Sequence, residues 1–71
     1  MAMLITAIDA SAVPADWRPR MAAGYRELAE GNRLLHAATG SARYLELARL
    51  CEQNVAALEY GGVLRLEGGE L

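Results

Sequence analysis

Residues 36–48, HAATGSARYLELA, contain the break that decides the fold. Gly40 suits the position just after a helix, because glycine adopts the left-handed conformation without a steric penalty. Ser41 suits the N-cap of a following helix. A connection as short as Thr39-Gly40-Ser41 typically makes two helices antiparallel neighbours. The stretch therefore predicts a helical hairpin.

The helix after this break, predicted over residues 42–60, has a single apolar stripe. Six side chains fall within an arc of about 100° on a helical wheel. They are Tyr44, Leu47, Ala48, Cys51, Val55 and Leu58. Leu45 and Leu50 flank this stripe, and they exceed what packing on one neighbouring helix requires. Gly61-Gly62 is expected to end the helix.

The helix before the break, predicted over residues 17–38, begins after Asp16, a typical N-cap residue, with Pro19 in its first turn. Its apolar positions lie within an arc of about 140°. They are Trp17, Met21, Tyr25, Leu28, Leu35 and Ala38. Gly24 and Gly31 share this arc, although each glycine costs a helix roughly 1 kcal/mol relative to alanine. We therefore expect the two glycines to face the second helix and to permit a close approach of Tyr44 or Cys51.

The two ends of the chain have weaker patterns. Residues 1–15, MAMLITAIDASAVPA, predict a short strand or an extended arm. Residues 61–71 alternate apolar and polar side chains from Val63 to Glu67, which indicates a short strand or a frayed extra turn. The predicted fold is all-α: an antiparallel two-helix hairpin over residues 16–60, with short flexible or extended termini, completed by association with another chain.

The length of the chain supports this need for association. A domain of 71 residues buries only about 60% of its unfolded surface and usually requires a disulfide, a metal or a second chain. Cys51 is the only cysteine and His36 the only histidine, so we expect neither an internal disulfide nor a zinc site. We expect no metal and no cofactor. Association remains as the means of stabilisation.

Charge and hydropathy exclude several further classes. The net charge is −2 and all seven basic residues are arginines, without a basic stripe for nucleic acid. The absence of lysine excludes Schiff-base and P-loop chemistry. No apolar run reaches the roughly 18 residues of a membrane span. The start lacks a basic residue before its apolar stretch, and Asp9 interrupts that stretch, so we expect a cytoplasmic chain rather than a secreted one.

Candidate catalytic groups are poorly placed. In a hairpin, His36 and Cys51 differ in height by roughly 9 Å, whereas a hydrogen-bonded pair needs about 3 Å. Glu27 and Glu30 share a helix face, but the neighbouring arginines and water indicate a solvated surface. We expect no enzymatic activity and no small-molecule substrate.

The stretch from Ala38 to Leu58, ATGSARYLELARLCEQNVAAL, resembles the small co-chaperones of needle subunits in bacterial type III secretion. Those proteins are bare helical hairpins of similar length. Their small-residue break, early aromatic residue and later Ala-Leu/Ile pair match Thr39-Gly40-Ser41, Tyr44 and Ala57-Leu58. The resemblance implies binding to a helical-repeat chaperone that, together with this chain, keeps a needle subunit monomeric. The chain departs from the family at Gly61-Gly62, where the family continues an apolar helix.

We therefore expect a small protein-binding module, such as a co-chaperone or adaptor. The alternative is a self-associating four-helix homodimer, including the case of a phage-encoded inhibitor that binds a host protein. An enzyme subunit that lends no catalytic residue would show the same pattern. The predicted hairpin-packing residues are Gly24, Leu28, Gly31, Tyr44, Cys51 and Leu58. The predicted partner-binding residues are Trp17, Leu34, Leu45, Leu50 and Tyr60.

Overall fold

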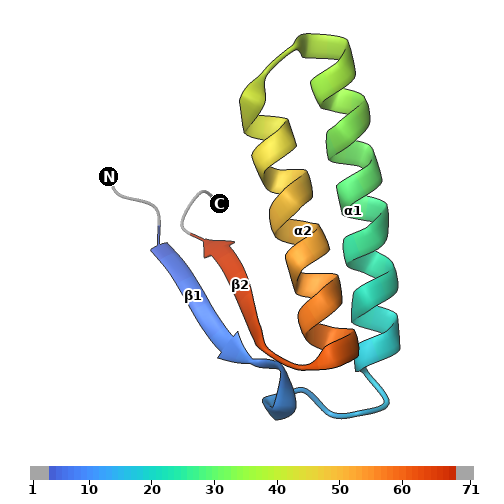
Figure 1. Cartoon of the computed structure of the whole chain (residues 1–71), viewed down its shortest axis with the longest axis vertical. Helices are drawn as coiled ribbons and strands as arrows, with labels where there is room; N and C mark the ends of the chain where they lie inside the picture. Colours follow the sequence, from blue (N-terminus) through green and yellow to red (C-terminus); the bar gives the residue numbers. More distant parts are fainter. Residues whose placement is uncertain (1–3, 69–71) are drawn as a thin grey trace.

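The computed structural model describes residues 4–68, which form two helices and a small sheet (Figure 1). The elements in chain order are β1 (Leu4–Asp9), the 3-10 turn η1 (Ala10–Ala12), α1 (Arg18–Thr39), α2 (Ala42–Tyr60) and β2 (Val63–Gly68). The helices pack side by side in opposite directions, which confirms the predicted hairpin. In Figure 1, α2 lies between α1 and the sheet. One long side of α1 therefore has no neighbour among the described elements.

The helix ends follow local chemistry. Gly40 has a φ of 73° and its N–H donates to the carbonyl of His36 at 2.7 Å, which closes α1. Ser41 is the N-cap of α2, as predicted. Pro19 lies in the first turn of α1, but the N-cap is Trp17, so the prediction of Asp16 is wrong by one residue. The reason is a turn that precedes the helix. In this turn the N–H of Trp17 donates to the carbonyl of Pro14 at 3.0 Å, and Asp16 is one of the residues between them.

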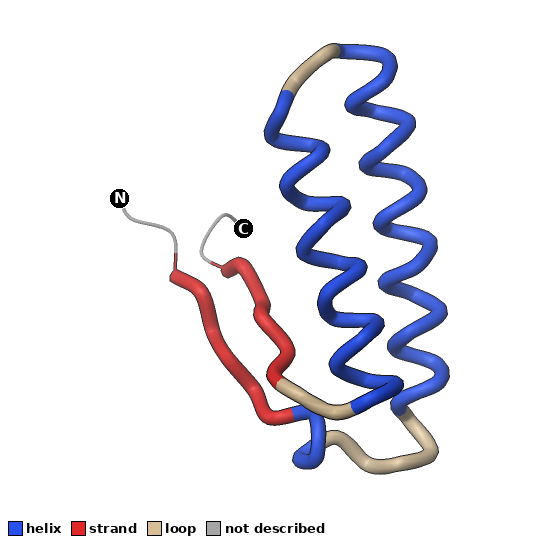
Figure 2. Tube along the Cα trace, in the orientation of Figure 1, coloured by secondary structure: helices blue, strands red, loops and turns tan. Residues whose placement is uncertain are grey.

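A segment near each end of the chain, β1 and β2, pairs with the other, so the fold is mostly α rather than all-α. The outermost parts of the predicted termini, residues 1–3 and 69–71, lie outside the described residues. β1 and β2 form an antiparallel sheet in which Ile8 lies opposite Leu64 and Ala7 opposite Arg65 (Figure 2). Because side chains alternate along a strand, Ile8 and Leu64 point to the same face. Leu64 is buried and Ile8 packs against the core, so this face is the one that covers α2. The prediction of an all-α chain is wrong because the short strands β1 and β2 stabilise each other by pairing, although they lie far apart in the sequence.

The hydrophobic core is small. Among the side chains that the structure describes, eight hydrophobic ones are buried and five of these are alanines. The main cluster joins η1, both helices and β2, and consists of Ala10, Ala22, Val55, Ala57, Leu58 and Leu64. Leu58 is thus buried as the hairpin prediction expects. The large hydrophobic side chains left exposed are Trp17, Leu28, Leu34, Leu35, Tyr60 and Val63.

Asp9 stabilises the turn that follows β1. Its Oδ1 atom accepts hydrogen bonds from the backbone N–H of Ser11 at 2.9 Å and from the Ser11 hydroxyl at 2.8 Å. Both bonds favour the ionised carboxylate, the backbone bond most, so they lower the pKa of Asp9 below its usual range.

This capping predicts a pH dependence at acid pH. Because the folded pKa is lowered, the contribution of Asp9 to stability is present above the unfolded pKa of about 3.9 and is lost as the pH falls through the folded pKa. In an NMR titration, we expect the carboxyl carbon of Asp9 to titrate below the ordinary aspartate range. Ser11→Ala should raise this midpoint partway, since the backbone bond remains. A midpoint that Ser11→Ala leaves unchanged would contradict the assignment.

Candidate protein-interaction face

The side of α1 that packs on α2 has alanines at its centre, and the half-buried Met21 and Tyr25 pack against the same core cluster beside them. Ala22 and Ala29, one above the other at a spacing of seven residues, are both buried. Ala22 belongs to the same cluster as Val55 and Leu58 of α2. Small side chains allow the backbones of two helices to approach closely. The alanines therefore permit the close approach of α2 that was predicted for the glycines.

Gly24, Gly31 and Leu28 do not pack on α2, and their prediction as hairpin-packing residues is wrong. A Cβ atom at either glycine would meet no heavy atom of residues 4–68 within 4 Å, apart from chain neighbours and the helix's own backbone. The side chain of Leu28 is 55% exposed. The alanine side is already filled by α2. The two glycines and Leu28 lie on the side turned away from it, whereas the half-buried Met21 in the same row still packs against the core cluster.

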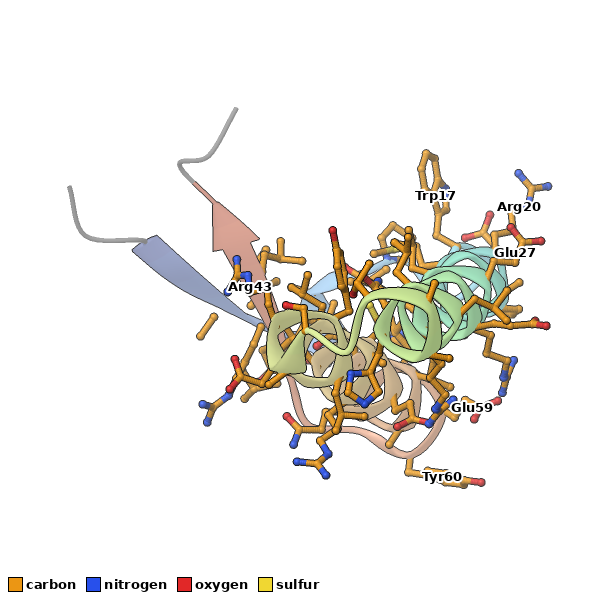
Figure 3. The ribbon with its side chains drawn as sticks, turned by 90° about the horizontal axis from the view of Figure 1, so that it is seen from above. Trp17, Arg20, Glu27, Arg43, Glu59 and Tyr60 are labelled. Atoms are coloured by element: carbon orange, nitrogen blue, oxygen red, sulfur yellow. The ribbon has the colours of Figure 1, made fainter. Side chains whose placement is uncertain are left out.

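This row forms a second apolar side of the helix, which we call the outer face of α1. It consists of Trp17, Met21, Gly24, Leu28, Gly31, Leu35 and Ala38. Successive members are alternately four and three residues apart, the heptad spacing by which helices pack against each other. Figure 3 shows Trp17, Arg20 and Glu27 projecting from α1 on the side opposite to Glu59 and Tyr60.

The surface of the outer face is hollowed around its glycines. One shallow hollow is lined by Met21, Gly24, Tyr25 and Leu28. A second is lined by Glu27, Leu28, Gly31, Asn32, Leu34 and Leu35. Leu28 lines both hollows, and Leu34, which lines the second, has 66% of its surface exposed. The outer face therefore presents alternating ridges and depressions that are apolar.

The opposite side of the hairpin is polar. Arg26 and Arg33 of α1 form ion pairs with Glu59 and Glu52 of α2, respectively. These pairs lie along a groove whose floor includes Ala29 and Val55. Exposed pairs of this kind contribute only about 0.2–1 kcal/mol each, and they keep this side hydrated. The two sides of the hairpin thus differ sharply in polarity.

The remaining predicted site residues occupy different positions. Tyr44, Leu45, Leu50 and Cys51 are half-buried, so the two leucines are less available than predicted. Burial raises the pKa of the Cys51 thiol, which favours the protonated and weakly nucleophilic form. Tyr60 is 86% exposed but lies away from the outer face (Figure 3). Trp17 and Leu34 are exposed on or beside that face.

Asn54 is a key residue that the sequence analysis missed. Its side chain is 2% exposed and pairs with the backbone of β2: Nδ2 donates to the Arg65 carbonyl and Oδ1 accepts from the Arg65 N–H, both at 2.9 Å. The amide group thus replaces a neighbouring strand at the edge of β2 and holds the sheet on α2. A polar residue at the edge of the apolar stripe of α2 was the available signal.

Chemical sites are not evident in the described part of the chain. Within residues 4–68, no group of three or more His, Cys, Asp or Glu side chains is placed to hold a metal ion. No helix among these residues has the length and apolarity to cross a membrane. No protein family, curated protein or solved structure matches the chain. The outer face of α1 is therefore the candidate site.

Proposed function

We propose that the protein is a small protein-binding module that uses the outer face of α1 to pack on another protein chain. The observation that supports this is a continuous apolar row, at heptad spacing, on a helix whose other apolar side is already covered by α2. Heptad rows of this kind are characteristic of helix–helix interfaces. Exposed aromatic residues such as Trp17 are enriched at such interfaces.

The composition of the core supports the same proposal. A core made mostly of alanines provides little hydrophobic stabilisation, because stabilisation scales with the apolar area removed from water. Meanwhile, Leu28, Leu34 and Leu35 are exposed on one helix. Covering these leucines with a partner would add the apolar burial that the single chain lacks. Action as a co-chaperone of the type III needle-subunit kind remains a prediction within this proposal.

Site-specific photo-crosslinking in cells tests the proposal. A benzophenone amino acid would replace Leu28 or Leu35 on the outer face, and Ala37 would serve as the control. Ala37 is also exposed on α1 but does not belong to the outer face. We expect protein adducts from Leu28 and Leu35 and none from Ala37. Equal adducts from all three positions, or none from any, would contradict the proposal.

A further inference from the structure

We infer that the chain covering the outer face of α1 is a second copy of this protein, with the two α1 helices packed antiparallel. The inference rests on the proposed function, because it names the partner of the same face. The assembly would have the two α1 helices at its centre, with α2 and the sheet of each copy outside them. Three features support the inference: the order of side-chain sizes along the outer face, the charges along α1, and the length of α1.

The order of side-chain sizes along the outer face is self-complementary when one copy is reversed. Large side chains alternate with small ones from Met21 to Ala38. In an antiparallel pair centred between Leu28 and Gly31, every layer joins a large residue of one copy to a small residue of the other. The layers are Met21 with Ala38, Gly24 with Leu35, and Leu28 with Gly31, each present twice. Met21 is half-buried and also packs against the core of its own copy, so it forms the edge of the contact. A parallel pair would set leucine against leucine and glycine against glycine, so overfilled layers would alternate with voids.

The space above the glycines fits this arrangement. Because a Cβ at Gly24 or Gly31 would meet no other part of residues 4–68, each glycine leaves a depression on the surface. A leucine from the second copy would fill it and bring the helix axes to about 8 Å, the close end of helix packing. The contact would also offset the helix-propensity cost of two glycines, roughly 1 kcal/mol each, which no contact at these glycines within residues 4–68 offsets.

The charges along α1 also favour the antiparallel orientation. Its first turn contains no acidic residue, and Arg20 lies near its start, beside the outer face (Figure 3). Antiparallel packing brings Arg20 close to the carboxyl end of the partner's α1, where the last carbonyl groups carry partial negative charge. Parallel packing would instead bring the Arg20 side chains of both copies together. The two helix dipoles are likewise opposed only in the antiparallel pair.

The length of α1 is sufficient for a specific but weak dimer. A helix over Arg18–Thr39 is about 33 Å long and its packing surface about 10 Å wide, so two copies cover roughly 600 Å² in projection. The accessible area of the corrugated side chains is larger, which brings the pair to the lower end of specific interfaces, about 1,000–1,200 Å². Interfaces at this lower limit are typically weak or transient, so we expect a reversible dimer rather than a permanent one.

Sedimentation equilibrium of the full chain tests the inference, at concentrations from about 5 to about 500 µM. We expect a reversible equilibrium between monomer and dimer. Leu28→Glu should weaken it by at least about 100-fold, because each dimer then buries two carboxylates in apolar layers. Tyr60→Glu is the matched control, since it changes an exposed aromatic residue away from the outer face and should leave the equilibrium unchanged. Circular dichroism verifies that both variants keep their helices.

The possible failures are distinguishable. A chain that stays monomeric throughout this range, or a dimer that Leu28→Glu does not weaken, would overturn the inference. If the chain is monomeric while Leu28 and Leu35 still give position-specific adducts with a different protein, the proposed function stands and only the identity of the partner is wrong. If the chain neither self-associates nor gives adducts, the inference and the proposed function are both wrong.

A spin label tests the orientation of the helices. Cys51→Ala removes the native thiol, and Thr39→Cys provides a single labelling site at the exposed last residue of α1, outside the packing layers. In the antiparallel dimer the two labels lie at opposite ends of the helix pair, about 25–30 Å apart. In a parallel dimer they would lie about 10 Å apart. A distance near the smaller value would overturn the antiparallel arrangement.

Discussion

Leu64→Ala should lower the free energy of unfolding by about 2–5 kcal/mol, the usual cost of removing a buried leucine. Leu64 is 1% exposed and is the largest apolar side chain so fully buried among those that the structure describes. The neighbouring core residues include Ala10 and Ala57, whose short side chains cannot extend into the vacated space. A domain of this length has about 4–11 kcal/mol of stability in total, so the variant should be close to unfolding at room temperature.

Urea denaturation at a fixed protein concentration measures this loss, with Val63→Ala as the matched control. Val63 precedes Leu64 in β2 but is 49% exposed. Its replacement should cost less than about 1 kcal/mol, because little packing is removed and only strand propensity changes. Similar losses for both variants would show that β2 does not pack on α2 through Leu64.

Asn54→Ala should cost about 2–3 kcal/mol through the loss of two hydrogen bonds to β2. Each bond contributes about 1 kcal/mol net, and the backbone N–H and carbonyl of Arg65 are left without these partners. We expect the sheet to separate from α2 before the hairpin unfolds. Hydrogen exchange should therefore accelerate most at the amides of β2. Gln53→Ala, at an exposed neighbouring position, should leave both stability and exchange nearly unchanged.

A second variant separates the two hydrogen bonds of Asn54. Asn54→Asp keeps an acceptor for the Arg65 N–H but places an oxygen against the Arg65 carbonyl. Burial and this repulsion disfavour the ionised carboxyl group, so its folded pKa should be raised above about 3.9. The variant should be most stable at acid pH and lose stability as the pH rises from the unfolded pKa to the folded one. A variant whose stability does not fall over this range would contradict the proposed pairing.

The hairpin was predictable because its signals are local. Gly40 and Ser41 determine the break through their own backbone preferences, and the apolar stripe of α2 follows the helical period. The sheet was harder to predict, because β1 and β2 are separated by both helices and each strand is short. The position of β2 depends on Asn54, whose pairing with Arg65 is visible only in three dimensions.

The orientation of α1 was mispredicted for a different reason. Helical periodicity shows which residues share a side of a helix, but it does not show which neighbour covers that side. The row with Met21 and Leu28 is the more hydrophobic one, and it was therefore assigned to α2. The structure uses Ala22 and Ala29 at the centre of that contact, because alanines allow the shorter distance between the helices, and only Met21 of the other row also packs against the core. The glycines that seemed to explain the hairpin lie on the outer face of α1.

The central claim is that two copies of the chain associate through the outer face of α1. The most direct test is a concentration series of amide NMR spectra of the ¹⁵N-labelled protein, from about 20 µM to about 1 mM. We predict concentration-dependent shifts at the amides of Gly24, Leu28 and Gly31, and none at Ala37 or Asn54. Spectra that remain unchanged at every concentration, or shifts confined to the sheet and α2, would contradict the claim.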